Sequence, residues 1–260
     1  MYSILRHNLI ETAMSKWLIA YALLFAAVSS AFFYISGSAG KSLVSLLNVV
    51  LVVIPLMGTV FGCVYFYSRR SFIEFLLAQP VSRPGVFLAS YLALAVPLAV
   101  AFAVGLASSF LVYGDAILQE LGNASALLSA GVALTFSSTA IAFVISLLWD
   151  DRMQGTAAAL LLWLFFSVIY DGMILLAATA LSEYPVETIV VGLNALNPVS
   201  LARVLILQNL DIAALMGYSG TVFHNLCGGV AGTAAAITML AFWVLGPLTL
   251  GILRFRRKDF

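Results

Sequence analysis

Residues 125–149 read SALLSAGVALTFSSTAIAFVISLLW and contain no charged side chain. As a helix, such a stretch can cross about 30 Å of hydrocarbon while its backbone polar groups pair with one another. Five more apolar stretches of similar length lie at 17–34, 45–67, 85–113, 156–181 and about 226–253. We therefore predict an all-α integral membrane protein with six transmembrane helices, built as one transmembrane domain over residues 1–260.

The composition excludes a water-soluble domain. Hydrophobic residues make up 63% of the chain and charged residues only 9%, against about 25% charged in an ordinary soluble domain. The net charge of +1 does not favour a nucleic-acid surface, because the basic residues stand at the ends of the apolar stretches. Cys63 and Cys227 form no CxxC or metal-binding spacing, and we expect free, packed cysteines.

The basic residues orient the predicted helices. If both termini lie in the cytoplasm, only Lys41 and Arg203 fall outside, which is the positive-inside pattern. The basic residues predicted on the cytoplasmic side are Arg6, Lys16, Arg69, Arg70, Arg83, Arg152, Arg254, Arg256, Arg257 and Lys258.

Three segments are more than turns. Residues 1–16 have the pattern of an amphipathic helix on the inner surface. Residues 68–83, SRRSFIEFLLAQPVSR, predict a short cytoplasmic helix that stops at Pro80. Residues 182–225 form the longest extracytoplasmic segment, in which Asn197 and Pro198 have the pattern of an N-cap and first helical residue. The helix that follows is too short to span, and we expect it at the outer interface.

The 68–83 helix would carry Phe72, Phe75 and Leu76 on one face. Such a helix can lie flat on the membrane or insert into a cleft of a cytoplasmic partner, and the residues alone do not separate these alternatives.

Asp171 is the only acidic residue deep within a predicted span. A carboxylate at a helix centre costs roughly 2.5–3.5 kcal/mol on insertion scales, so it should face protein or a water-filled cavity. We expect it to be hydrogen-bonded to Tyr170 or to Ser and Thr groups of neighbouring helices. A role in a transport pathway or gate and a purely structural contact both fit.

No catalytic residue or metal site is predicted. Gly40-Lys41-Ser42 resembles the end of a P-loop, but Ile35 replaces the required leading glycine and the segment should be an outer turn. His7 and His224 fall on opposite sides of the membrane. Without HExxH or GxSxG motifs, we expect a non-enzymatic chain.

Two glycine pairs predict close helix contacts. They are Gly58 with Gly62 and Gly228 with Gly232, each at the spacing that lets helix backbones approach. We expect contacts within one subunit rather than a dimer seam.

Taken together, these features resemble the permease subunits of ABC-2 type transporters. The resemblance rests on the inner loop at 74–83, the six spans, the polar segment before the last span and RFRRKDF at 254–260. A narrower resemblance, to NosY-type permeases of nitrous oxide reductase maturation, rests on Tyr170-Asp171, on LNPVSLARVLIL at 196–207 and on DIAALMGYSGTVF at 211–223. In one respect the chain departs from many ABC-2 permeases, which have a glutamate near Arg70 and a lysine near Ser90.

The resemblance implies an ABC-2 (type V exporter-like) fold in the bacterial inner membrane. Two permease copies would pair with two ATPase subunits and with a periplasmic protein of NosD type. No cofactor is expected in this chain, since ATP and Mg²⁺ would bind the ATPase. The implied function is ATP-driven export of a sulfur-containing species for assembly of the copper–sulfur centre of nitrous oxide reductase. The alternatives are export of another substrate, or a stand-alone channel or secondary carrier.

The resemblance also makes the 68–83 helix a coupling helix that docks in a cleft of the ATPase. The residues expected to couple to the ATPase are Arg69, Arg70, Phe72, Glu74, Phe75, Leu76, Gln79 and Arg83. The expected pathway or gating residues are Tyr170 and Asp171. Those expected to contact an extracytoplasmic partner are Asn197, Pro198 and Arg203.

Overall fold

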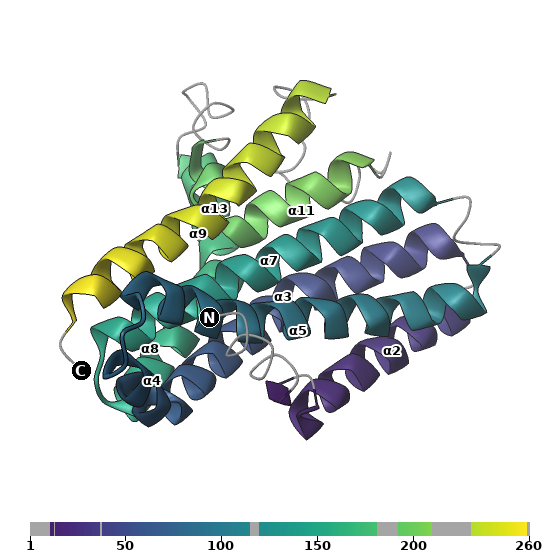
Figure 1. The fold of residues 1–260 in the computed structure, drawn as a ribbon. Helices are drawn as coiled ribbons and strands as arrows, with labels where there is room; N and C mark the ends of the chain where they lie inside the picture. Colours follow the sequence, from purple (N-terminus) through teal and green to yellow (C-terminus); the bar gives the residue numbers. More distant parts are fainter. Residues whose placement is uncertain are drawn as a thin grey trace.

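The computed structural model describes residues 11–12, 14–36, 38–114, 120–180, 192–209 and 230–258. The principal elements of these residues are α-helices (Figure 1). They are α2 (Lys16–Ser36), α3 (Ala39–Ser68), α4 (Arg70–Leu77), α5 (Arg83–Val112), α7 (Leu121–Leu148), α8 (Arg152–Leu164), the π-helical segment η1 (Phe165–Ile169), α9 (Tyr170–Ala180), α11 (Pro198–Asn209) and α13 (Val230–Arg257).

Six helices in the described part of the chain are long and apolar enough to cross a membrane. They are α2, α3, α5, α7, the rod made by α8, η1 and α9, and α13. All six match predicted spans. One boundary prediction was wrong: α3 begins at Ala39, so Gly40-Lys41-Ser42 forms its first turn rather than a loop turn. The Ser42 hydroxyl there donates to the carbonyls of Ser38 and Phe32, 2.9 and 3.1 Å away.

The helix α7 is the centre of the bundle. It contacts α3, α5, α11 and α13, while α2 packs against α5 and α3 (Figure 1). This position agrees with its sequence, because a helix surrounded by protein can carry small and apolar residues on every side. The bundle therefore has its most buried spans in α5 and α7, and its most exposed in the α8–η1–α9 rod and α13.

The close contact between α3 and α7 depends on two glycines of α3, which have no side chain to separate the helices. A Cβ at Gly58 would overlap Ser138 of α7, and one at Gly62 would overlap Ala142. Next to Gly62, the buried thiol of Cys63 lies 3.7 Å from the Ala142 carbonyl and forms no disulfide. The expected contact within one subunit and the expected free cysteine are confirmed for these residues. The pair Gly228 and Gly232, and Cys227, lie outside the residues whose side chains the structure describes.

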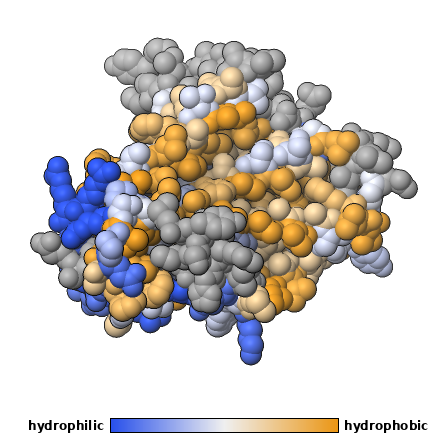
Figure 2. Space-filling model, in the orientation of Figure 1, coloured by the Kyte–Doolittle hydropathy of each residue, from blue (hydrophilic) through white to orange (hydrophobic). Residues whose placement is uncertain are grey.

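Charge collects at one end of the bundle, here called the basic end. This end holds α4, the start of α2, the turn between α7 and α8, and the end of α13 (Figure 1). Apart from Lys41 and Arg203, every described Lys and Arg lies within or directly beside these segments, or at the start of α5 or α8. Figure 2 shows this end as a hydrophilic tip beside a largely apolar flank. Most of the predicted helix at 1–16 lies outside the described residues, as do parts of the 182–225 segment.

Candidate functional site

The short helix α4 lies across the basic end and joins α3 to α5. Its buried side chains are Ile73 and Leu76, at 2% and 5% exposure. Phe72 and Phe75 are exposed, Phe75 at 63%. The predicted single face of Phe72, Phe75 and Leu76 was therefore wrong, because Leu76 turns with Ile73 into the core. An outward pair of aromatic rings remains, held on a helix whose other face is fixed by packing.

Because one face of α4 is buried, Leu76 cannot contact a partner as expected, and the exposed residues of α4 form the available surface. Leu76 packs beside Val86 of α5 and is not available on the surface. Phe72, Phe75, Glu74 and the following Gln79 are exposed. This outward set is polar at its edge and aromatic at its middle, as in the anchor regions of protein interfaces.

Arg70 begins an ionic network that fixes α4 to the rest of the basic end. Its guanidinium contacts Glu74 one turn later, at 3.2 Å, and Asp150 in the α7–α8 turn, also at 3.2 Å. Lys258 after α13 reaches the same Asp150 carboxylate at 2.9 Å and donates to the Leu147 carbonyl at 2.8 Å. Arg83 closes the network by donating to the Lys258 carbonyl, 2.9 Å away. Thus α4, the α7–α8 turn, α13 and α5 are linked by charge-assisted contacts.

Asp150 is the shared acceptor of this network. The hydrogen bond and charge of Lys258, followed by the charge of Arg70, hold the pKa of the Asp150 carboxyl below its ordinary value. No local sequence pattern indicates this role, because Asp150 and Lys258 are far apart in the chain. The ion pairs also show that Arg70 has two acidic partners, Glu74 and Asp150.

Arg69 connects α4 to the N-terminal segment. Its guanidinium lies 2.7 Å from the carboxylate of Glu11 and over the rings of Tyr65 and Phe72, at 5.3 and 6.0 Å from their centroids. Cation–π contacts of this kind contribute about 0.5–1 kcal/mol at exposed sites. Arg69 therefore contacts both the Phe72 ring of α4 and Glu11 in the segment before α2.

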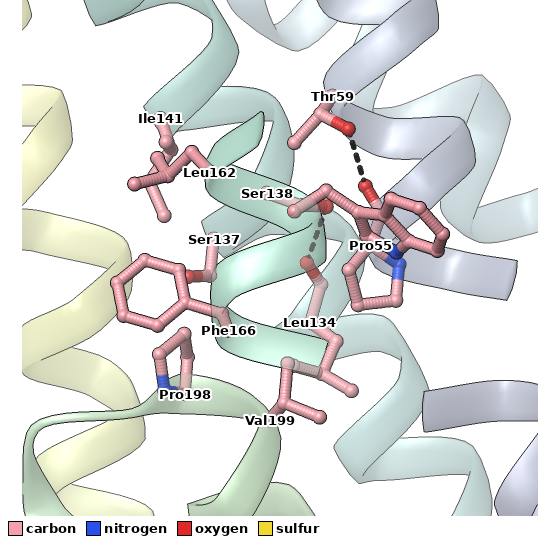
Figure 3. A pocket seen from close by; sticks show the side chains of 11 residues that line it. Pro55, Thr59, Leu134, Ser137, Ser138, Ile141, Leu162, Phe166, Pro198 and Val199 are labelled. Carbon is pink, nitrogen blue, oxygen red and sulfur yellow. Dashed lines mark hydrogen bonds between the residues drawn. The ribbon is translucent and has the colours of Figure 1, made fainter. Parts of the chain in front are cut away.

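The helix α11 does not lie at an interface; it enters the bundle. Pro198 and Val199 line a small cavity with Pro55 of α3, Ser137 of α7 and Phe166 of η1 (Figure 3). Ser137 stands about 17 Å from the end of α7 at 1.5 Å per residue, in a helix about 42 Å long. Since α11 starts beside this residue, it starts near the middle of the span and runs away from the basic end (Figure 1). The helix α11 therefore packs within the bundle against α7, α13 and α3, and not at the outer end where we expected it; we call it the re-entrant helix below.

A residue of the predicted cap fixes this entry point. The Asn197 side chain accepts a hydrogen bond from the Val199 amide at 2.9 Å, which confirms the predicted N-cap. Its amide nitrogen donates to the Phe166 carbonyl at 2.8 Å. Phe166 belongs to the π-helical turn η1, and such turns expose carbonyls that a regular α-helix would pair within itself. The Phe166 carbonyl of the π-helical turn and the side-chain amide of Asn197 are therefore hydrogen-bonded to each other within the bundle.

Two more hydrogen bonds hold the turn before α11. The Tyr170 hydroxyl donates to the Leu193 carbonyl at 2.7 Å, and the Trp243 indole of α13 donates to the Ala195 carbonyl at 3.0 Å. The Tyr170 hydroxyl is thus committed to the chain before α11, so it is not the partner of Asp171 among the hydroxyl groups that we expected there. The accepting carbonyls belong to a short helical turn at 192–195, whose exposed backbone groups are thus paired by the surrounding protein.

Asp171 has a charged partner that the sequence did not predict. Its carboxylate forms an ion pair with Arg203 of α11 and accepts a longer hydrogen bond, 3.4 Å, from the Ser200 hydroxyl. The Asp171 and Arg203 side chains are 33% and 26% exposed. The expected serine partner is confirmed. The pair also explains how a carboxylate is accommodated within a span, since each charge compensates the other.

The expected partner contacts before and in α11 need correction. Asn197 is fully buried, and Pro198 is buried beside it. Arg203 is directed to Asp171. Asn197 and Pro198 therefore build the interior of the bundle and are not available on its surface.

Comparison with known proteins places this architecture in a family. The family model for "ABC-2 family transporter protein" matches residues 2–260. A probable ABC transporter permease protein NosY from Pseudomonas aeruginosa is 25% identical over 276 residues, covering 99% of this chain and 98% of that protein. A probable ABC transporter permease protein NosY from Stutzerimonas stutzeri is 24% identical over 281 residues, with the same coverage. The chain belongs to the ABC-2 family of transporter proteins, as a multi-pass, non-catalytic permease subunit that works with a separate ABC ATPase.

Proposed function

We propose that this chain is the NosY-type permease of an ATP-driven exporter in the bacterial inner membrane. Two copies would pair with two ATPase subunits, with the basic end and both termini in the cytoplasm. The proposal is supported by the two NosY relatives, which match nearly the whole chain. The collection of positive charge at one end of the bundle supports the orientation.

The observation that carries the coupling role is the division of α4 into two faces. Ile73 and Leu76 fix the helix to the bundle, while Phe72 and Phe75 point away from it. The aromatic pair would fill a cleft of the ATPase. Closure of the ATPases on ATP would then push α4, and the Arg70–Asp150–Lys258 contacts would pass this movement to the α7–α8 turn and α13 as rigid elements.

The re-entrant helix would be the gate of the pathway. It is joined to α9 through Asp171 and Arg203, and it packs against α13, whose Trp243 indole holds the Ala195 carbonyl just before α11. A movement of α13 would therefore displace α11 as well. The exported species would be a sulfur-containing compound used for the copper–sulfur centre of nitrous oxide reductase. A periplasmic protein of NosD type would meet the end of the bundle opposite the basic end.

The test is complementation of cells that lack their own NosY-type permease. We expect the chain, expressed with its ATPase, to restore nitrous oxide reduction and the spectroscopic signature of the copper–sulfur centre. Restored ATPase assembly without that signature would contradict the cargo assignment. Transport by the purified chain in vesicles without any ATPase would contradict the coupled mechanism itself.

A further inference from the structure

A pocket at the basic end shares Asp150 and Lys258 with the proposed coupling network, but its two arginines, Arg254 and Arg257, have no role in that network. It lies between the ends of α7 and α13 and has a volume of about 270 Å³. Its walls are Leu147, Leu148, Asp150, Arg254, Arg257 and Lys258. A pocket with three cations and one carboxylate has a clear preference for an anion.

The positive charge of this pocket is only partly neutralised. Asp150 is shared by Lys258, at 2.9 Å, and Arg70, at 3.2 Å. Arg254 and Arg257 are exposed, and neither side chain forms an ion pair within the described part of the chain. They stand three residues apart on α13, a spacing that places two side chains on one face of a helix. Two guanidinium groups on one face can hold phosphate oxygens in bidentate fashion.

An apolar surface continues from this pocket toward the middle of the bundle. Leu250 and Leu253 precede Arg254 and Arg257 by four residues each, so every leucine lies one turn below an arginine on the same face. These leucines are 60% and 55% exposed, and Leu148 across the pocket is 47% exposed. The surface thus has cations at the level where the spans end and exposed leucines directly beneath them.

We propose that this pocket binds the headgroup of an anionic phospholipid. Its phosphate would lie between Arg254 and Arg257, and an acyl chain would follow Leu250 and Leu253. Basic pockets between transmembrane helices are suited to acidic headgroups. The apolar face beneath the arginines favours a lipid over an acidic protein segment, because a docked protein would not reach below the headgroup level.

The experiment measures binding of phosphatidylglycerol and phosphatidylcholine to the purified full chain in mixed micelles. We expect preference for phosphatidylglycerol. Each of Arg254→Gln and Arg257→Gln should weaken phosphatidylglycerol binding about fivefold, and the pair roughly 25-fold. Arg256→Gln is the matched control, since it removes one charge from the same helix end but does not line the pocket. It should change binding less than twofold, by our estimate from its position.

Three results with the variants would overturn the assignment, and a phosphate titration supplies a fourth. The first is unchanged phosphatidylglycerol binding in the double variant, and the second is equal weakening by Arg256→Gln. The third is loss of ATPase association in the double variant with lipid binding intact, which would make the pocket a protein-docking surface. A parallel titration with inorganic phosphate separates headgroup recognition from simple anion binding: competition below millimolar phosphate would contradict a lipid site. A double variant with Arg254 and Arg257 changed to lysine should keep most of the preference for phosphatidylglycerol, because the charges remain. This variant shows whether weaker binding by the glutamine variants comes from lost charge or from a misfolded chain.

Discussion

The carboxylate of Asp171 and the guanidinium of Arg203 form an ion pair that joins α9 to the re-entrant helix α11. Asp171→Asn would leave Arg203 without its counter-charge in a partly enclosed site. We expect the complex to lose about 1–3 kcal/mol of stability, since an uncompensated group carries its desolvation cost. The measurement is thermal unfolding in detergent, together with transport by the assembled complex.

A double variant separates the pair from its surroundings. Asp171→Asn combined with Arg203→Gln should be less destabilised than the sum of the two single variants, because each charge is then removed together with its partner. Additive losses would mean that the ion pair does not couple the two helices. Full transport by a normally assembled Asp171→Asn complex would remove Asp171 from the proposed gate.

We expect that the stability of the chain depends on both the side-chain oxygen and the side-chain nitrogen of Asn197. Asn197→Ala removes the cap of α11 and leaves the Phe166 carbonyl without its donor. A lost cap costs about 0.5–2 kcal/mol, and the unsatisfied carbonyl adds about 1–3 kcal/mol. Asn197→Asp keeps the capping oxygen but not the donor, so it should not rescue the melting temperature. A melting temperature of Asn197→Asp equal to the unmodified chain would contradict the Phe166 contact.

The close approach of α3 and α7 predicts a position-specific glycine effect. Gly58→Val would force its side chain onto Ser138, and overpacking of this kind typically costs about 1–3 kcal/mol. Gly172→Ala is the control, because nothing lies within 4 Å of a Cβ at that helical position. It should be neutral or should stabilise by up to about 1 kcal/mol. Similar melting temperatures for the two variants would contradict the α3–α7 packing.

Asp150 predicts a pH dependence with a definite sign. Because Lys258 and Arg70 lower its pKa in the folded chain, its contribution to stability is complete above the ordinary value of 3.8 and is lost as the pH falls below it. Asp150→Asn should therefore flatten the fall in melting temperature below that pH, and leave the dependence above it unchanged. A flattening confined to neutral pH would contradict the assignment, and Asp151→Asn provides the neighbouring control.

The spans could be predicted from the sequence because each one is an apolar run of membrane length. The position of α11 could not, since PVSLARVLIL has the same composition whether it lies at an interface or between α7 and α13. Arg203 was assigned to the outside for that reason, which hid its pairing with Asp171. Re-entry into the bundle is set by tertiary partners such as the Phe166 carbonyl, and these have no local signal.

The face of α4 shows a similar limit. An eight-residue helix with Phe72, Ile73, Phe75 and Leu76 has apolar residues on most of its circumference. The helices packed beneath it decide which of them are buried. The sequence therefore predicted the docking helix and most of its exposed residues, but included Leu76, which the bundle buries.

The most direct test of the account is co-purification of the ATPase with Phe75→Asp. We expect the variant chain to reach normal levels and melting temperature, since Phe75 is 63% exposed, while bound ATPase falls at least tenfold. Met153→Asp, at 81% exposure on the same end, is the matched control and should retain the ATPase. Leu76→Asp should instead lower the melting temperature, because it buries a carboxylate. Normal ATPase association with Phe75→Asp would contradict the assignment of α4 as the coupling helix.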